Sequence, residues 1–376
     1  MMYSVPGTVL LLVAFLHSVQ AQQLIDPRAD PRTKALYSNL FLISEKGFMF
    51  GHQDDDAYGV TWKAEKGRSD VKDICGSYPA VHGWDIGKSL EIKHNIDSVR
   101  FKSMLKWMKQ IRKRGGINTV SWHWDNPVTK GSSWDKTSAV KDILPGGQKH
   151  DVLTQHLDLL ARFFKKSKSP IIFRPWHEHN GDWFWWGKGN CTEEEYIQLW
   201  RFTVDYLRDE KQVHNLIYAF SPDRSRIDSA VTRKSYLYGY PGDNYVDLLG
   251  IDNYMDVGVA WNRYSPEEQR ASFVRSLKMV SDLAKEKNKV AALTETGQEG
   301  VKNSSWFTEV ILSPIKDNDI QIAYVLVWRN ANDKHHYAPY KGHSSAENFL
   351  EFCRDEKTFL ESDIQHIYET DKPLTR

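Results

Sequence analysis

The chain has 376 residues, of which 26% are charged, and its 50 Lys and Arg against 49 Asp and Glu give a formal net charge of +1. This length fits one large domain or two small ones, and it can bury a sizeable core. Because there is no basic block and no acidic tail, the composition argues against nucleic acid and anionic membranes as partners.

The first 21 residues contain no Asp, Glu, Lys or Arg and include the largely apolar run TVLLLVAFL. Small residues follow in SVQA, just before Gln22, which is typical of a secretory signal peptide and its cleavage site, although the usual basic start is missing. A membrane anchor is the alternative, but the run is well short of the ~20 residues that a span requires. We therefore expect residues 1–21 to be a signal peptide and residues 22–376 to form one secreted, extracellular domain.

Eight short apolar runs recur along the chain, and each ends in polar or aromatic residues. They start at Phe48, Pro79, Gly116, Pro170, Asn215, Val246, Val290 and Ile322. Apolar runs of this length without alternation indicate strands that are buried on both faces, as in a parallel sheet.

Helical patterns separate these runs, with apolar side chains repeating on one face at 104–111, 153–164, 197–207 and 273–284. Two of the helices are expected to begin with capping boxes, Thr192-x-x-Glu195 and Ser265-Pro266-x-Glu268. Eight strand–helix units predict an α/β fold of the (β/α)8 TIM barrel type in a single domain. A doubly wound open sheet is the rival, but no GxGxxG follows the first strand.

Two further segments fall outside the regular alternation. A helical segment near 31–46 precedes the first strand, and we expect it to pack outside the barrel or to cap its bottom. Residues 126–148 are too many for a helix alone, so they predict a loop over the cleft, followed by a helix from about His150.

The three cysteines, Cys75, Cys191 and Cys353, lie far apart without a CxxC pair, which argues against a zinc site. One disulfide with one free thiol, or three buried thiols, remain open. Asn190-Cys191-Thr192 and Asn303-Ser304-Ser305 are N-glycosylation sequons, as expected of a secreted glycoprotein. The 14 tryptophans indicate either a core of large residues or a cleft lined with rings.

In a barrel of this kind, the chemistry lies where the strands end. The residues there are His123 and Trp124, His177 and Glu178, Asp252 and Tyr254, Glu295, and Trp328 and Arg329. Each of them alone has an ordinary structural explanation, but five such ends together indicate a site.

Glu178 and Glu295 follow the fourth and seventh strands, so a closed barrel directs both carboxylates into one cleft. Facing carboxylates suit glycosidic hydrolysis, in which one protonates the leaving oxygen and the other attacks the anomeric carbon or activates water. The rings around Glu178, in FRPWHEHNGDWFWWG, fit this chemistry because they stack on sugars and because apolar surroundings raise the pKa of a carboxyl group.

Other chemistries have weaker support. A cation could bind at His52, Asp54, Asp55 and Asp56 in GHQDDD, or at His335 and His336, but no recognisable ligand spacing connects these groups. Ser/His/Asp hydrolysis lacks a GxSxG elbow. We therefore expect neither a metal nor a cofactor.

The chain resembles glycoside hydrolase family 26 from about Phe48 to Asn330. The motifs GHQDDDAYG, SWHWDNP, RPWHEHNGDWFWWG, DNY, TETG and VWRN occur in the order seen in that family, and the one around Glu178 is the most specific. The resemblance implies a retaining enzyme on a (β/α)8 barrel, of a family that is mostly endo-β-1,4-mannanases with a minority acting on mixed-linkage glucan or xylan.

The resemblance also implies a role for each matching residue. Glu178 is the expected acid/base and Glu295 the expected nucleophile. His177 would orient the catalytic groups or the sugar, His123 would bind the sugar before the scissile bond, and Trp183 would stack on the sugar after it. Asp252 and Tyr254 would line the cleft, with Tyr254 bonded to the nucleophile, while Trp328 would form the floor and Arg329 would reach sugar hydroxyls.

The sequence therefore predicts a secreted, monomeric, retaining endo-β-1,4-mannanase. Its expected substrates are mannan, glucomannan, galactomannan and manno-oligosaccharides. Two alternatives stay open: a mixed-linkage β-glucan endoglucanase on the same scaffold, and a barrel that binds sugar without cleaving it. The last alternative expects one of the two glutamates to be replaced, whereas both are present.

Overall fold

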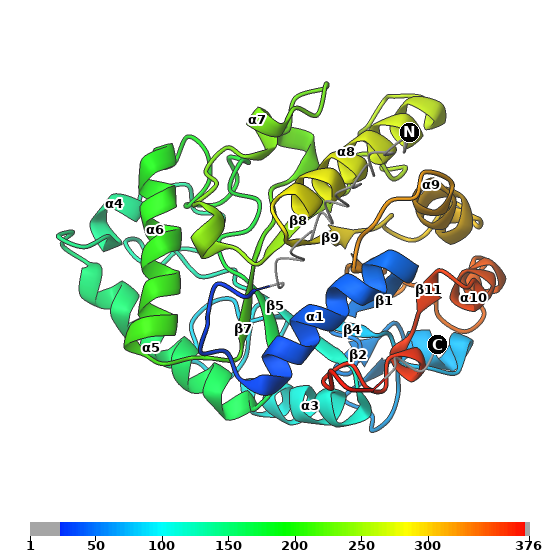
Figure 1. Ribbon diagram of the computed structural model, residues 1–376, viewed down its shortest axis with the longest axis horizontal. Coiled ribbons are helices and arrows are strands. Elements are labelled where there is room, and N and C mark those ends of the chain that lie inside the picture. The colour runs from blue at the N-terminus through cyan, green and yellow to red at the C-terminus, as the bar shows by residue number, and fades with distance from the viewer. Residues whose placement is uncertain (1–22, 373–376) are drawn as a thin grey trace, which may run out of the picture.

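The computed structural model describes residues 23–372, so the expected signal peptide lies outside the described residues. Its centre is a closed barrel of eight parallel strands, in which β10 pairs with β1 to complete the circle (Figure 1). The barrel strands are β1 (Phe48–Gln53), β4 (Val81–Asp85), β5 (Ile117–Ser121), β6 (Ile171–Arg174), β7 (Leu216–Phe220), β8 (Leu248–Asn253), β9 (Val290–Thr296) and β10 (Tyr324–Val327). All eight predicted runs are therefore confirmed as strands.

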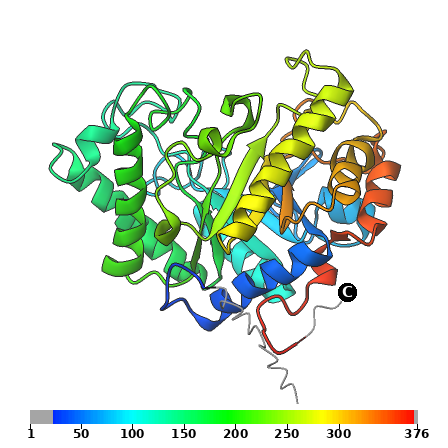
Figure 2. The same cartoon turned by 45° about the horizontal axis from the view of Figure 1, so that its top comes forward.

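Helices surround the barrel, and every barrel residue is buried because they cover its outer face (Figure 2). The longer ones are α3 (Phe101–Arg114), α5 (His150–Ser167), α6 (Glu193–Asp205), α8 (Pro266–Glu286) and α10 (Ala346–Arg354). Short helices stand between them: α2 (Asp70–Cys75), α4 (Val140–Ile143), α7 (Arg233–Tyr236) and α9 (Ser313–Asp317). The (β/α)8 barrel predicted from the alternation is confirmed.

The helix starts follow the expected capping chemistry. Thr192 and Ser265 each accept a hydrogen bond on the side chain from the backbone N–H three residues on, and the Glu195 and Glu268 carboxylates each accept one from the backbone N–H of the cap residue. These reciprocal bonds satisfy backbone donors that the first turn of a helix leaves free. Both predicted capping boxes are therefore confirmed, and α5 begins at His150 as expected.

Alternating side chains of the strands point inward and form the barrel core, with Met49, Val81, Ile117, Ile172, Ile217, Leu248 and Leu326 among them. The helix α1 (Pro31–Lys46) covers the lower end of this core with Leu36, Leu40 and Ile43. Of the two expectations for this helix, capping the bottom is therefore correct. The residues that follow the strands are left free at the opposite end.

The C-terminal segment lies beside α1 at the same end of the barrel (Figure 2). The Asn39 side chain donates hydrogen bonds to the carbonyls of Ile367 and Glu369, at 2.9 and 3.0 Å. A short strand, β11 (Thr358–Phe359), pairs with the first two residues of β1, Phe48 and Met49. The C-terminal segment is therefore held against the middle of α1 beneath the barrel.

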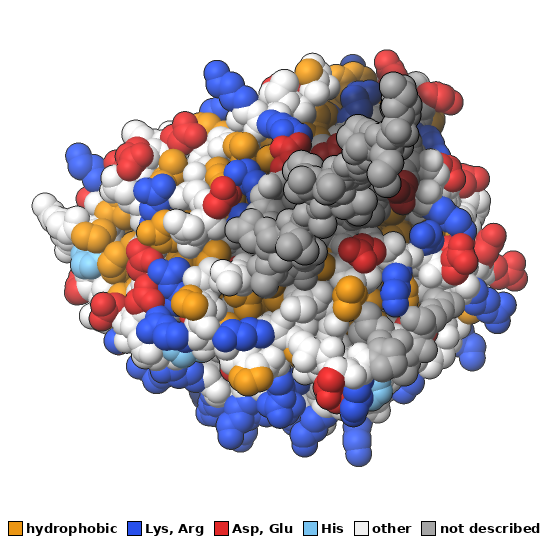
Figure 3. All heavy atoms as spheres, in the orientation of Figure 1, with side chains coloured by type: hydrophobic (Ala, Val, Ile, Leu, Met, Phe, Trp, Pro, Cys, Tyr) orange, Lys and Arg blue, Asp and Glu red, His pale blue; other side chains and the backbone are white. Residues whose placement is uncertain are grey.

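The surface is charged in both senses, with acidic and basic side chains interspersed on the face seen in Figure 3. Lys and Arg side chains gather along its lower edge, over α3, whose other face buries Met104, Met108 and Ile111. They are thus the solvated side of an amphipathic helix. Among the described helices, none combines the length and the apolar character needed to cross a membrane.

A disulfide joins Cys75, at the end of α2, to Cys353 in α10, with 6.4 Å between their Cα atoms. Cys191 is the one free thiol among the three cysteines, and burial raises its pKa to about 12. This resolves the pairing that the sequence left open. The bond connects positions 278 residues apart, so it restricts the unfolded chain strongly.

We expect Cys353→Ser to lower the free energy of unfolding by about 2–5 kcal/mol, because the unfolded chain regains the freedom that the bridge removes. Urea unfolding under non-reducing conditions measures this loss. Cys191→Ser is the matched control, since it makes the same chemical change and leaves the bridge intact. Equal losses in the two variants would mean that the bridge contributes nothing.

Candidate active site

A cleft of about 460 Å³ opens at the end of the barrel where the strands finish. Its lining comes from segments that follow β5, β6, β8, β9 and β10. The residues include His123, Trp134, Glu178, Trp183, Phe184, Tyr254, Trp261, Glu295, Gln298, Glu299, Lys302, Trp328 and Tyr337. The structure thus brings together six of the nine predicted site residues in the lining, and the other three lie beside or beneath it.

Glu178 and Glu295 face each other across this cleft. One carboxylate oxygen of each, together with one of Asp252, forms a group whose members lie within 4.8 Å of one another. Glu295 belongs to β9, whereas Glu178 lies beyond β6 in a turn with a left-handed backbone (φ 51°). The Glu178 backbone N–H donates to the carbonyl of Ser221 at 2.9 Å, which holds the turn against the end of β7.

The surroundings of Glu178 favour its neutral form. Burial raises the pKa of Glu178 well above its usual range, and the carboxylates of Asp223, Asp252 and Glu295 raise it further. One contact acts in the opposite direction, because the Trp183 indole N–H donates to Glu178 Oε2 at 2.9 Å and stabilises the charged form. A carboxyl group in this setting stays protonated to higher pH and can serve as a proton donor.

Glu295 is held in the opposite electrostatic setting. It receives a hydrogen bond from Arg174 Nη2 on Oε1 and one from the Tyr254 hydroxyl on Oε2 at 3.2 Å. Arg174 is 2% exposed, so its charge acts with little screening by water. The two glutamates therefore have different surroundings: desolvation and nearby carboxylates favour the neutral form of Glu178, whereas a buried cation contacts Glu295.

Asp252 does not line the cleft, contrary to the expectation. It is fully buried beneath the two glutamates, where Arg174 Nη1 donates to it at 2.7 Å and the Thr294 hydroxyl at 2.6 Å. The reason is Arg174: a buried guanidinium requires anionic partners, and Asp252 is one of the two. Asp252 thus positions the arginine that contacts Glu295.

Two of the predicted histidines form a chain behind Glu178. Asp85 accepts a hydrogen bond from His123 Nδ1 at 2.7 Å, and His123 Nε2 lies 3.2 Å from His177 Nε2. Burial lowers the pKa of His123, but Asp85 more than compensates and raises it. Burial and the charge on His123 hold the pKa of His177 well below its usual range. These opposite shifts favour His123 as the donor and His177 as the acceptor in this contact.

The aromatic residues divide between core and cleft, so each of the two interpretations of the tryptophans is partly correct. Eight of them have less than about 3% of their surface exposed: Trp84, Trp122, Trp124, Trp176, Trp185, Trp186, Trp200 and Trp306. Four line the cleft: Trp134, Trp183, Trp261 and Trp328. Trp134 and Trp261 are half exposed or more, which leaves ring faces free for a ligand.

The position of the Trp183 ring depends on Gly181, two residues before it. A Cβ atom on Gly181 would lie 2.4 Å from the Trp183 ring, so only glycine lets the ring fold back toward Glu178.

Arg329, predicted to reach the sugar, lies outside the cleft lining and pairs with Asp97 at 3.2 Å. Trp328 lines the cleft as expected.

Several residues of the site are not among those predicted from the sequence. Arg174 and Asp85 hold predicted residues in place, and Trp134, Trp261 and Tyr337 line the cleft. The available signal for Arg174 and Asp85 was a charged residue at the end of a buried strand, which requires a partner. Trp134 stands in the loop expected to cover the cleft, so its place was partly foreseeable.

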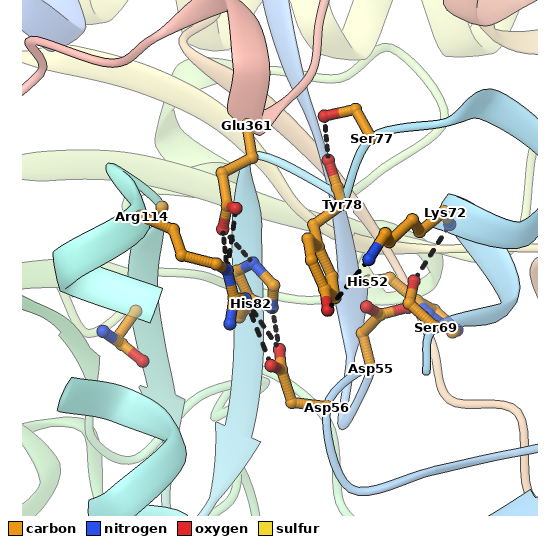
Figure 4. A network of polar contacts seen from close by, with 12 residues as sticks. His52, Asp55, Asp56, Ser69, Lys72, Ser77, Tyr78, His82, Arg114 and Glu361 are labelled. Carbon is orange, nitrogen blue, oxygen red and sulfur yellow. Dashed lines mark hydrogen bonds and ion pairs between the residues drawn. The ribbon is translucent and has the colours of Figure 1, made fainter. Parts of the chain in front are cut away.

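The side chains of the two predicted cation sites contact other groups of the protein. Asp55, Asp56 and His82 approach within 4.8 Å of one another, but His82 bridges Asp56 and Glu361, and Arg114 contacts the same two carboxylates (Figure 4). These acids raise the pKa of His82 to about 9, so it contributes a second positive charge. His52 pairs with Asp55 at 2.9 Å. Cations of the chain therefore already balance the acids around His82.

At the other predicted site, His335 contacts Glu299 and His336 contacts His343.

The family follows from comparison with known proteins. The model of glycosyl hydrolase family 26 matches residues 25–347. The chain belongs to glycoside hydrolase family 26. The match covers every barrel strand and both facing glutamates, so the chain is a glycoside hydrolase.

Individual relatives agree with this assignment. A mannan endo-1,4-β-mannosidase from Bifidobacterium adolescentis is 33% identical over 367 residues, which cover 90% of this chain and 35% of that protein. A mannan endo-1,4-β-mannosidase from Bacillus subtilis is 26% identical, with 85% of each chain covered. The structure of a family 26 β-mannanase from Bacteroides ovatus superposes with a TM-score of 0.83 at 39% identity, covering 91% of this chain and 98% of that one.

Proposed function

We propose that this protein is a secreted enzyme that hydrolyses internal β-1,4-mannosidic bonds of mannan, glucomannan or galactomannan with retention of configuration. The observation that carries the mechanism is the approach of the Glu178 and Glu295 carboxylates, whose nearest oxygens lie within 4.8 Å. Retaining glycosidases hold their carboxyl groups about 5–5.5 Å apart, whereas inverting ones leave about 6.5–9.5 Å for a water molecule. The named mannanases among its relatives support the substrate.

The first step begins with Glu178 protonated and Glu295 ionised. Glu178 gives its proton to the oxygen of the leaving sugar while a Glu295 oxygen attacks the anomeric carbon, so the glycosidic bond breaks as a glycosyl ester forms. Trp183, in contact with Glu178, is placed to stack on the leaving sugar. Arg174 and Tyr254 orient the attacking carboxylate.

In the second step Glu178 is a carboxylate and takes a proton from water, which attacks the ester and releases Glu295. Each displacement inverts the anomeric carbon, so the product keeps the β configuration. His123 and Trp328 line the cleft on which the sugar rests.

The disulfide supports secretion, because such bonds persist in oxidising compartments.

Product analysis tests the activity and its stereochemistry together. We expect short manno-oligosaccharides from mannan and glucomannan, and proton NMR of the first products should show the β anomer. An initial α anomer would mean that water attacks directly. If the protein cleaves mixed-linkage β-glucan faster than mannan, the endoglucanase alternative is correct. If it binds the polysaccharide and releases no products, it is a sugar-binding barrel.

We further expect Trp183→Phe to move the basic limb of the kcat/KM profile to higher pH. The Trp183 N–H stabilises the charged form of Glu178, so its loss raises the pKa of Glu178 further. The acid is active below its pKa and is lost as the pH rises through it, so a higher pKa extends activity upward. Trp328→Phe is the control, since it alters the cleft without touching Glu178. If the basic limb of kcat/KM falls at the same pH in both variants as in the unchanged protein, Glu178 is not the acid.

A further inference from the structure

The two N-glycosylation sequons stand in different surroundings. A glycan on asparagine is attached through the side-chain nitrogen Nδ2, so the neighbours of that atom decide whether the folded protein tolerates it. Asn190 precedes the helix α6, and Asn303 lies between β9 and α9.

Asn190 uses its Nδ2 to hold the loop that carries Trp183. It donates to the carbonyl of Phe184 at 2.7 Å and to that of Asp182 at 3.2 Å, and the residue is half-buried. A sugar replaces one of the two hydrogens on Nδ2, so at least one of these bonds is lost on modification. That loss falls on the loop whose indole contacts Glu178.

Asn303 has the opposite arrangement. Its Oδ1 accepts a hydrogen bond from the Ser305 backbone N–H at 2.9 Å, which fixes the sequon in a turn. Within residues 23–372 its Nδ2 donates to no protein atom, and Asn303 is exposed together with Lys302 and Ser304. A sugar on this nitrogen therefore breaks no contact of the described chain.

There is also room for sugars at Asn303. The residue borders an open groove of about 410 Å³, lined by Gly258, Pro266, Gln269, Val310 and Pro314 among others. Its neighbour Lys302 lines the active-site cleft. A glycan here would stand on the rim between the groove and the cleft.

We propose that Asn303 is a site of N-linked glycosylation in this chain and that the folded, active protein carries no glycan at Asn190, because the Asn190 amide holds the Trp183 loop. The proposal rests on the secretion that forms part of the proposed function. It predicts a glycan at Asn303 and none at Asn190, although the two sequons are equivalent as sequence patterns.

Site occupancy in secreted protein tests this. The full chain is expressed in a yeast that N-glycosylates its secreted proteins, and the purified protein is treated with peptide N-glycosidase in H₂¹⁸O. Peptide mass spectrometry should show conversion to ¹⁸O-labelled aspartate at Asn303 and unmodified asparagine at Asn190. An unlabelled Asn303, or a labelled Asn190 in the active protein, would overturn the proposal.

Matched variants separate the sequon from the fold. Ser305→Ala removes the hydroxyl that the sequon needs, and Ser304→Ala makes the same change one residue earlier and keeps the sequon. Neither hydroxyl donates a hydrogen bond within residues 23–372, so both variants should fold. We expect only Ser305→Ala to lose the glycan mass; a glycan lost from both variants or from neither contradicts the assignment.

A second expression with the yeast's own leader in place of residues 1–21 keeps the two proposals apart. If only that form reaches the medium, the expectation of a signal peptide in this chain is wrong. The occupancy of Asn303 is then read on the protein that was secreted, where an empty Asn303 overturns the glycosylation proposal alone.

Discussion

Glu295→Ala should abolish hydrolysis of mannan and of aryl β-mannosides alike. Without the carboxylate that Arg174 and Tyr254 orient, no glycosyl ester can form, and a better leaving group does not replace the missing nucleophile. Steady-state kinetics on a polymer and on a dinitrophenyl glycoside measure this. Near-normal turnover would remove the two-carboxylate mechanism.

Glu178→Ala should behave differently on the two kinds of substrate. Cleavage of mannan should fall by at least the ~10²–10⁴-fold that general acid catalysis is typically worth, because a sugar leaving group requires a proton. Dinitrophenolate leaves without one, so the first step should survive, and the glycosyl-enzyme should accumulate because Glu178 also activates water. Added azide, which needs no base, should restore turnover and give a β-glycosyl azide.

These outcomes assign the roles of the two glutamates. If Glu178→Ala is equally inactive on both substrates, or if Glu295→Ala is the variant rescued to a β-azide, the assignment fails. Burst kinetics with and without azide, on both variants, distinguish these cases.

Arg174→Met should be the other severe variant, with losses in both stability and rate. It leaves Asp252 and Glu295 buried without their cation, and removing one partner of a buried pair typically costs about 3–5 kcal/mol. The orientation of the nucleophile is lost as well, and removing one preorganised electrostatic contact lowers kcat by about 10²–10³-fold. Urea unfolding and kcat on mannan, measured where the variant is folded, give the two quantities.

Arg224→Met provides the matched control for Arg174→Met. Arg224 is buried, pairs with Asp256 at 3.1 Å and does not line the cleft. Its replacement should lower stability to a similar extent and leave kcat near normal. Equal kcat in the two variants would mean that Arg174 serves only the fold.

The fold was predictable from the sequence because its signals are local. A strand buried on both faces reads as an uninterrupted apolar run, and a capping box is complete within four residues. The approach of Glu178 and Glu295 to each other was predictable for a related reason, since the ends of parallel strands must converge at one end of a barrel.

What the sequence could not provide depends on contacts between distant segments. Arg174 and Asp252 lie 78 residues apart, and only the closed barrel shows that one neutralises the other beneath the cleft. The same holds for the choice of Cys75 and Cys353 among three cysteines, and for the division of the tryptophans between core and cleft. Patterns along the chain give the type of a side chain and its direction, but not its partner.

Both ends of the described chain lie at the lower end of the barrel, and this has a practical consequence. A tether placed at either end attaches at the pole opposite the cleft, so the enzyme can be fixed to a bead or a cell wall with its cleft facing outward. Linkers at either end would leave from the lower end of the barrel, away from the segments that line the cleft. An immobilised form should therefore keep access to long polymer chains.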